Sequence, residues 1–419
     1  MEDLSLKRPP KGWKEATIGE VIFPVSDTFD FTGKDKIHFL NTGDILDGKL
    51  LHNDLALVKS LPGQAKKRFQ RNDILYSEIR PANKRYMLVD FDSSNSVAST
   101  KLMVLRAKSN VRVEFIYKLI TSQEILNEFQ LIAESRSGTF PQITFDSISK
   151  LSLLLPTIPE QQAITAVLSS FDDKIELLRA QNKTLENIAQ ALFKHWFIDF
   201  EFPDKNGTPY KSNHGEMIDS ELGEIPEGWK IGGLSKIADF LNGLALQNFP
   251  PENTTEYLPV IKIRELKAGF SDQTDKASTN IDSKYIINNG DILFSWSGSL
   301  DVDIWQYGKG ALNQHLFKVT SNQYPKWFFL YWIKEHLLSF RQTAAAKAVT
   351  MGHIKRHHLD DALVVIPTDK FIKIANDLFE PLIEKIALNN SQIQTLSKMR
   401  NTVLPKLMRG EIRVKGFNN

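Results

Sequence analysis

Three clusters of basic residues with aromatic or histidine neighbours are the side chains in this sequence best suited to bind an anionic partner. They read KKRFQR (66–71), RPANKRY (80–86) and KRHH (355–358). Such clusters are typical of nucleic-acid surfaces, where phosphate contacts supply salt-sensitive affinity and a smaller set of side chains reads base edges. The alternative for each cluster is an ordinary solvated face. Together with a loop after a predicted strand, they give the candidate DNA-binding residues Lys66, Lys67, Arg68, Arg71, Arg80, Lys84, Arg85, Trp296, Ser297, Lys355, Arg356 and His357.

Signatures of catalysis are absent from the sequence. There is no Gly-x-Gly-x-x-Gly motif after a strand and no P-loop, and the nearest match to a methyltransferase tetrad, NFPPEN (248–253), has the wrong residue order. His353 and His357 are spaced i, i+4 but have no Glu between them and no Cys nearby, so we predict no metal site there. We therefore expect no catalytic residue and no metal in this chain.

The composition excludes several classes of protein. The chain has 419 residues, a net charge of +2 and no cysteine, which rules out disulfides and thiolate metal sites. No apolar run of about 18 residues is present, and the first residues lack the apolar core of a signal peptide. We expect a cytoplasmic protein without a membrane segment, whose positive charge is local wherever it meets nucleic acid.

A long helix is predicted near the middle of the chain, in residues 158–197. Its apolar residues follow alternating steps of four and three, the heptad seam of a helix that packs lengthwise against another. Pro159 and Glu160 suit a helix start. An amphipathic core helix is the alternative when the segment is taken alone. The seam residues are Ile164, Leu168, Phe171, Ile175, Leu178, Asn182, Leu185, Ala189 and Leu192.

The same helix pattern occurs a second time, 211 residues further along the chain, so that residues 171–197 align with 382–408. Upstream matches, such as GWK at 12–14 and 228–230, show that the repeat covers more than the helices. Two helices with matching seams in one chain are predicted to pair in antiparallel fashion. The second seam comprises Phe379, Leu382, Ile386, Asn389, Ile393, Leu396 and Val403.

Each half of the chain therefore combines a mixed module with a long helix. Short β-like runs such as KLMVLRA (101–107) and DILFSW (291–296) precede helix-like stretches, 113–135 in the first module and 324–345 in the second. We predict a first module at 1–157, a central helix at 158–200, a linker and second module at 201–367, and a distal helix with a tail at 368–419. The order of the strands does not follow from the sequence.

Particular residues of the helices carry further predictions. Asn182 and Asn389 interrupt the seams, and we predict that their amides hydrogen-bond and fix the register, against the alternative of two separately solvated side chains. Pro381 is expected to kink or restart the second helix. The aromatic stripe Phe193, Trp196, Phe197 and Phe200 is expected to pack against a module of the same chain, with docking of a partner subunit as the second interpretation.

With these motifs in place, the chain resembles the DNA-specificity subunit of type I restriction–modification systems. The resemblance depends on IPEQQ (158–162), ALFKHWFIDFEFP (191–203), SELGEIPEGWK (220–230), the paired DILYS and DILFS, and LPKLMRGEI (404–412), and it extends over essentially the whole chain. The distal helix departs from the pattern, because IPTDKFIKI (366–374) lacks the Glu-Gln pair of IPEQQ. Contacts of Glu160 and Gln161 are therefore not expected at the second site.

The resemblance implies an α+β fold, in which two pseudo-symmetric target recognition domains are separated by two long antiparallel coiled-coil helices. It implies double-stranded DNA with a bipartite target as a partner, together with methyltransferase subunits and restriction/translocase subunits. S-adenosylmethionine, ATP and Mg would belong to those subunits, and this chain would carry no cofactor and no catalysis. The alternatives are a stand-alone DNA-modifying or DNA-cleaving enzyme with an unrecognised site, and a two-domain scaffold that binds only protein.

Overall fold

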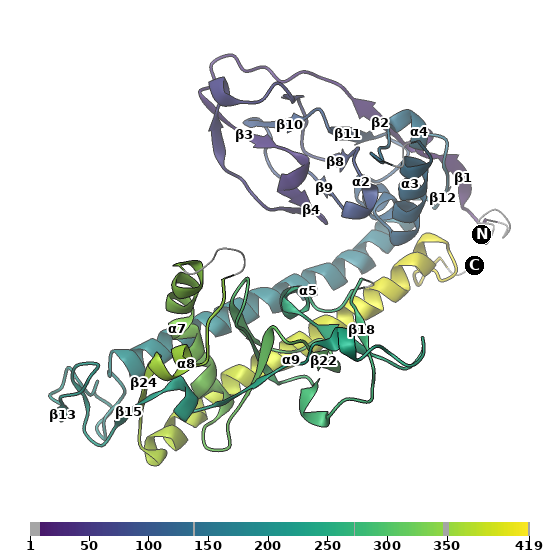
Figure 1. Cartoon of the computed structure of the whole chain (residues 1–419). Coiled ribbons are helices and arrows are strands. Elements are labelled where there is room, and N and C mark those ends of the chain that lie inside the picture. The colour runs from purple at the N-terminus through teal and green to yellow at the C-terminus, as the bar shows by residue number, and fades with distance from the viewer. Residues whose placement is uncertain (1–8, 137–138, 272, 347–351, 418–419) are drawn as a thin grey trace. The chain divides into compact units, whose positions relative to one another are not determined.

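The computed structural model describes residues 9–136, 139–271, 273–346 and 352–417. The chain forms two compact units, which are described separately: unit 1 is Met1–Lys174 with Leu396–Asn419, and unit 2 is Ile175–Thr395. Each unit holds one mixed module and a part of both long helices (Figure 1). Among the described residues, no helix combines the length and the apolar character needed to cross a membrane.

The first module builds two four-stranded sheets from its described residues. One sheet has the order β2-β11-β8-β9 and the other β6-β3-β10-β7, while β1 and β12 pair separately. The strands are β1 Lys14–Thr17, β2 Ile22–Val25, β3 Lys36–Leu40, β6 Leu55–Leu57, β7 Ala65–Lys67, β8 Asp73–Ser77, β9 Tyr86–Leu88, β10 Ser96–Ser99, β11 Leu102–Ala107 and β12 Ser152–Leu155, with the short pair β4 Ile45–Leu46 and β5 Lys49–Leu50. The helices are α1 Ile18–Val21, α2 Val113–Ile120, α3 Gln123–Arg136 and α4 Phe145–Ile148.

The second module repeats the order of the two four-stranded sheets and of the separate strand pair, although β4 and β5 have no counterpart among its described strands. Its sheets have the orders β16-β23-β20-β21 and β18-β17-β22-β19, and β15 pairs with β24 as β1 does with β12. In both modules one central pairing is parallel, β10 with β3 and β22 with β17. The strands are β15 Lys230–Gly233, β16 Asp239–Asn242, β17 Leu258–Ile261, β18 Lys276–Ala277, β19 Ile286–Ile287, β20 Ile292–Ser295, β21 Asp301–Ile304, β22 Gly310–Leu312, β23 Leu316–Thr320 and β24 Leu363–Ile366; the helices are α6 Ile263–Ala268, α7 Lys326–Ala346 and α8 His357–Asp361. The predicted duplication of an α+β module is thus confirmed.

The helical segment of the first module differs from the prediction, because residues 113–135 form two helices rather than one. The break lies at Thr121 and Ser122. The Thr121 hydroxyl donates to the carbonyl of Tyr117 at 2.7 Å, and the Ser122 backbone N–H turns back to Leu119 at 3.1 Å. Hydroxyl side chains that bond to the local backbone compete with helix continuation, which accounts for the interruption. The corresponding α7 of the second module is continuous, and its WFFLYWI stretch (327–333) is buried throughout.

The two long helices are α5, Ile158–Phe193, and α9, Asp369–Met408, and they run antiparallel in both units (Figure 1). In unit 1, Asp172 accepts from Arg400 Nη1 at 2.7 Å. In unit 2, the Phe193 and Phe379 rings lie 6.3 Å apart. Residues later in α5 therefore contact residues earlier in α9, which is the antiparallel pairing that the sequence predicted.

The expectation at Pro381 was a kink or a restart of the distal helix, and the restart is wrong, because α9 runs unbroken through this residue. A proline removes one backbone hydrogen bond from a helix and leaves the carbonyl four residues earlier without its partner. Here that carbonyl belongs to Asp377, and both Asp377 and Pro381 are exposed, so water can replace the lost donor.

The helix seams contribute to the interior of both units. Ile164 and Leu168 are fully buried in the core of unit 1, and Phe379 is fully buried in the core of unit 2. The remaining seam residues are buried or half-buried: Phe171, Ile175, Leu178, Asn182, Leu185, Ala189, Leu192, Leu382, Ile386, Asn389, Ile393, Leu396 and Val403. The aromatic stripe Phe193, Trp196, Phe197 and Phe200 is buried in the core of unit 2, as the first of its two interpretations predicted.

The predicted hydrogen bond between the seam asparagines is present in unit 2. Asn389 Nδ2 donates to Asn182 Oδ1 at 2.8 Å, and Asn182 Nδ2 donates to Asn390 Oδ1 at 2.7 Å. Asn389 is fully buried, and its own Oδ1 has no hydrogen-bond partner among the described residues. A single polar pair in an otherwise apolar seam penalises other alignments of the two helices.

Candidate nucleic-acid interface

The basic residues of the first module fall into two groups with different surroundings. Lys66, Arg68 and Arg71 are exposed on and after β7. Arg68 and Arg71 also line a depression of about 630 Å³, whose other walls come from residues 29–34 and 91–94. Two exposed guanidinium groups at a concave surface suit contacts to phosphate.

The second group, Lys67 and Arg85, is engaged within the module. Lys67 Nζ donates to the carbonyl of Leu102 at 2.8 Å, and burial lowers the pKa of this ammonium group, although the carboxylate of Glu78 opposes the shift. Arg85 Nη1 donates to the carbonyls of Gly43 at 3.1 Å and Ile45 at 2.9 Å. These two side chains hold backbone segments together, so they are less available to a ligand.

Arg80 and Lys84 flank a tight turn in the first module. Both have left-handed backbones, with φ of 43° and 54°, on either side of a 3₁₀ turn at Pro81–Asn83. This conformation is unfavourable for residues other than glycine and persists only where the surroundings enforce it. The turn is fixed by the Arg80 N–H, which donates to the carbonyl of Pro141 at 3.1 Å, and it leaves the Arg80 side chain exposed.

In the second module the basic cluster lies at the start of α8. Lys355, Arg356 and His357 are exposed. One Arg356 nitrogen, Nη2, lies 3.4 Å from the carbonyl of Phe240, and the His357 ring lies 4.1 Å from that of His358. The cluster is anchored at its base and open to solvent at its tips.

Trp296 and Ser297 hold a neighbouring segment in place and are not part of an open loop. Trp296 Nε1 donates to Asn242 Oδ1 at 3.0 Å and to the carbonyl of Gln314 at 3.1 Å. Ser297 is 4% exposed, and its Oγ lies 2.9 Å from His315 Nδ1. Both side chains therefore brace the segment that contains Gln314 and His315.

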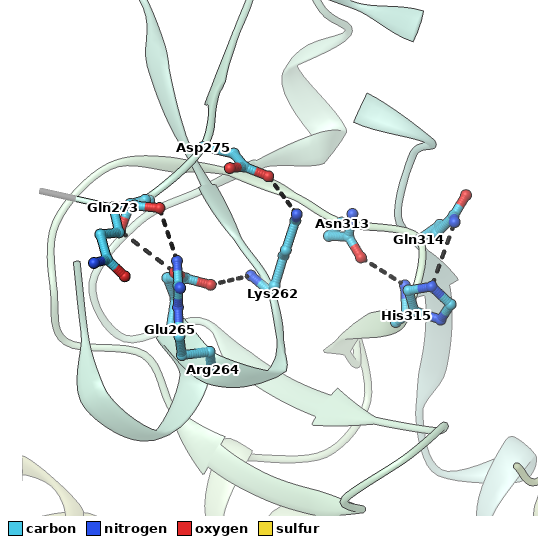
Figure 2. Close-up of polar contacts among 9 residues, drawn as sticks. Lys262, Arg264, Glu265, Gln273, Asp275, Asn313, Gln314 and His315 are labelled. Carbon is cyan, nitrogen blue, oxygen red and sulfur yellow. Dashed lines mark hydrogen bonds and ion pairs between the residues drawn. The ribbon is translucent and has the colours of Figure 1, made fainter. Parts of the chain in front are cut away.

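That segment, Asn313–Gln314–His315, faces a depression of about 540 Å³ in the second module, and Figure 2 shows its side chains opposite those of Lys262 and Arg264. The His315 N–H donates to Asn313 Oδ1 at 3.2 Å, and Gln314 Nε2 lies 3.4 Å from His315 Nε2. Amide, imidazole, ammonium and guanidinium groups thus meet at one concave surface. Such a set of donors and acceptors suits recognition of a polar, anionic ligand.

The cations at the other rim of this depression are held by carboxylates. Lys262 pairs with Asp275, and this hydrogen bond is the main cause that lowers the pKa of the Asp275 carboxyl. Arg264 Nη2 donates to Glu265 Oε1 at 2.7 Å and to the carbonyl of Gln273 at 2.9 Å. Both cations keep about half of their side-chain surface exposed, so they are oriented and still accessible.

Sequence reasoning identified Trp296 and Ser297 but missed Asn313, Gln314 and His315. The three residues form a turn between two strands and have neither a basic run nor a periodic pattern to mark them. The one available signal was their composition, since three consecutive amide and imidazole side chains between two apolar strands are unusual.

Across the part of the chain that the structure describes, no group of three or more His, Cys, Asp or Glu side chains is arranged to hold a metal ion.

Comparison with known proteins gives a consistent assignment. The model of the type I restriction modification DNA specificity domain matches residues 10–187 and again 226–398. The HindI specificity subunit, a type I restriction enzyme component of Haemophilus influenzae, is 33% identical over 96% of this chain and 99% of its own. The MjaIX specificity subunit of Methanocaldococcus jannaschii is 30% identical over 74% of this chain and 71% of its own.

A solved structure supports the fold alone. The type I restriction-modification system S subunit from M. genitalium has a TM-score of 0.53 at 15% identity, and the match covers 94% of this chain and 96% of that one. The duplicated topology, the antiparallel helices and the two matches to the domain model agree with one another. The chain belongs to the family of type I restriction modification DNA specificity subunits.

Proposed function

We propose that this chain recognises a double-stranded DNA target in two parts, with one half-site for each module. The observation that carries the proposal is the match of the DNA specificity domain to both repeats, each of which has the same strand order. Two modules with one fold and different surface side chains can read two different half-sites. The proposal includes no catalysis by this chain, whose relatives are named as specificity subunits.

The partners in this proposal are methyltransferase subunits and restriction/translocase subunits, which assemble on the chain in the cytoplasm. S-adenosylmethionine would bind to the former, and ATP and Mg to the latter. The exposed apolar residues of the long helices support a docking role. Leu177 and Leu388, for example, occupy equivalent positions in the two repeats and are each 51% exposed. A matched position on two helices suits two copies of one partner.

The DNA contacts in this proposal come from the exposed cations. Lys66, Arg68, Arg71 and Arg80 would meet phosphates in the first module, as would the cluster Lys355–His357 in the second. We assign Lys67 and Arg85 to positioning, because their hydrogen bonds are already made within the module. The role of Lys84 is local to the turn at residues 81–83.

The experiment is long-read sequencing of modified adenine in the host genome, with and without this gene. The expected result is a split motif that disappears on deletion. A modification pattern that is unchanged by deletion would refute the proposal. The purified chain, incubated alone with DNA and either S-adenosylmethionine or Mg²⁺, is the second test: activity without partners would favour the stand-alone enzyme.

A further inference from the structure

The two modules share a three-residue turn that carries the chain from one sheet to the other. In the first module the turn comprises residues 99–101, the last residue of β10 and the two that lead into β11, and in the second it comprises residues 313–315 between β22 and β23. Because the strands correspond in order and pairing, the two turns occupy equivalent places in the fold. They can therefore be compared atom by atom without reference to how the two units lie.

The backbone of this turn is held in the same way in both modules. The Lys101 N–H donates to Ser99 Oγ at 3.2 Å, and the His315 N–H donates to Asn313 Oδ1 at 3.2 Å. The carbonyl of Lys101 accepts from the Glu78 N–H at 3.0 Å, and that of His315 accepts from the Trp296 N–H at 3.4 Å. A buried side-chain oxygen and a neighbouring strand end thus fix each turn.

The N–H of the middle residue is also bonded in both modules, but to segments that do not correspond: one precedes β7 and the other follows β16. The Thr100 N–H donates to the carbonyl of Gln64 at 2.8 Å, and the Gln314 N–H donates to that of Leu244 at 2.8 Å. The first residue is buried in both modules, at 0% exposure for Ser99 and 5% for Asn313. The first and last residues of the turn are therefore held alike, whereas the support of the middle residue and the side chains at the tip differ.

These tips have different hydrogen-bonding chemistry. The first module presents Thr100 and Lys101, whereas the second presents Gln314 and His315. A constant frame with variable tips is the arrangement required where two related modules must read different base sequences. In the second module the tip faces the 540 Å³ depression, with Lys262 and Arg264 across it (Figure 2).

We propose that this turn is the base-reading element of each module, with Gln314, positioned by His315, reading one half-site and Thr100 and Lys101 reading the other. A glutamine carboxamide matches the paired acceptor and donor of adenine in the major groove, and a lysine matches the acceptors of guanine. Lys262 and Arg264 then contact the adjoining phosphates and fix the register of the DNA. The inference rests on the proposed DNA recognition and assigns the residues that determine its specificity.

The test uses the complex of the full chain with its methyltransferase subunits, expressed in a host without other adenine methylation. The variants Gln314→Ala and Lys101→Ala occupy neighbouring positions of equivalent turns, so each serves as the control for the other. The readout is the methylated motif obtained by long-read sequencing. We expect each variant to lose preference at one base pair by about tenfold or more, with the two losses in opposite half-sites.

Two results would overturn the inference: parental motifs in both variants, or a uniform fall in methylation at all positions. A parent complex that methylates no split motif would instead reject the underlying function. Gln314→Glu covers the case in which the alanine variant is poorly folded, because it keeps the side-chain length and exchanges the amide donor for an acceptor. It is expected to disfavour adenine and favour cytosine at the same base pair.

Discussion

A buried carboxylate in unit 1 provides a sharp test of how the ends of the first module are held. Glu160, in the first turn of α5, is fully buried. It accepts from Trp13 Nε1 at 2.8 Å and from both Arg413 Nε at 2.8 Å and Arg413 Nη2 at 2.7 Å. The start of the module, the start of α5 and the segment after α9 therefore meet at one side chain.

In unit 2 aromatic rings occupy the positions that correspond to this charged cluster. The positions equivalent to Trp13, Glu160 and Arg413 are Trp229, Phe371 and Phe202. The Phe202 and Trp229 rings stack at 5.1 Å, and Phe371 lies 4.6 Å from the former and 5.0 Å from the latter. The distal helix lacks the Glu-Gln pair because an apolar cluster in unit 2 replaces the charged cluster of unit 1.

The test introduces the aromatic residues of unit 2 at the equivalent positions of unit 1, one residue at a time. Glu160→Phe leaves a largely buried guanidinium without its carboxylate, and Arg413→Phe leaves the carboxylate with only Trp13. Breaking a buried pair costs about 3–5 kcal/mol. We expect about 3 kcal/mol for Glu160→Phe, the lower end of that range, because the Arg413 side chain is 15% exposed and can regain water, and about 5 kcal/mol for Arg413→Phe, because the Glu160 carboxylate stays fully buried. The double variant is expected to lose less than either single one, since an apolar replacement of a whole ion pair is often neutral.

Hydrogen exchange of the backbone amides in β1 and β12 is the local assay, because these strands pair beside the cluster. A loss of about 3 kcal/mol corresponds to roughly a hundredfold fall in protection. Thermal unfolding of the whole chain is the second measurement. Single variants that keep parental protection, or a double variant whose loss equals the sum of the two, would refute the reasoning.

Three further predictions concern the helices and the basic surface. Asn182→Leu should destabilise unit 2 by about 1–3 kcal/mol in thermal unfolding, because it leaves the Asn389 amide buried without a partner. Asn389→Leu should be neutral or stabilising, because it removes the buried amide itself. Equal losses of stability in the two variants would contradict this. Arg68→Ala should reduce the salt dependence of DNA binding by about one counterion with unchanged stability, whereas Arg85→Ala should lower the melting temperature; the reverse result would exchange their roles. At Asp172 burial raises the carboxyl pKa, but hydrogen bonds from its lysine and arginine partners outweigh it and lower the pKa overall. Its contribution to stability is therefore present above the unfolded-state pKa of about 3.9 and lost as the pH falls through the lower folded value, so Asp172→Asn should flatten acid unfolding in that window. Parallel acid profiles for parent and variant would count against it.

Features that repeat along the sequence were predictable, and features that depend on strand order were not. The heptad seams and the 211-residue offset were sufficient to predict the antiparallel helices and the Asn182–Asn389 hydrogen bond. Helix geometry determines which residues face a partner helix, so spacing in the sequence translates directly into contacts. The sheet order offers no such conversion. Strands of two to six residues carry too little pattern to specify their neighbours, and the parallel pairing of β10 with β3 joins segments more than 50 residues apart.

The candidate site also has some features that the sequence predicts and others that depend on the fold. Runs of basic residues are visible in a sequence, but whether a cation is free depends on what the fold places beside it: Arg85 ends on two carbonyls, while Arg68 ends in solvent. The turn at 313–315 is the opposite case, because it contains no run of basic residues and its correspondence to residues 99–101 is seen only in the fold. Duplication supplies this comparison from within one chain. Positions that keep their residue type in both repeats and are buried or half-buried, such as Ile175 with Ile386 and Leu185 with Leu396 in the helix seams, serve the fold. Positions that keep only their backbone contacts while the side chains differ are where the two modules can differ in what they recognise.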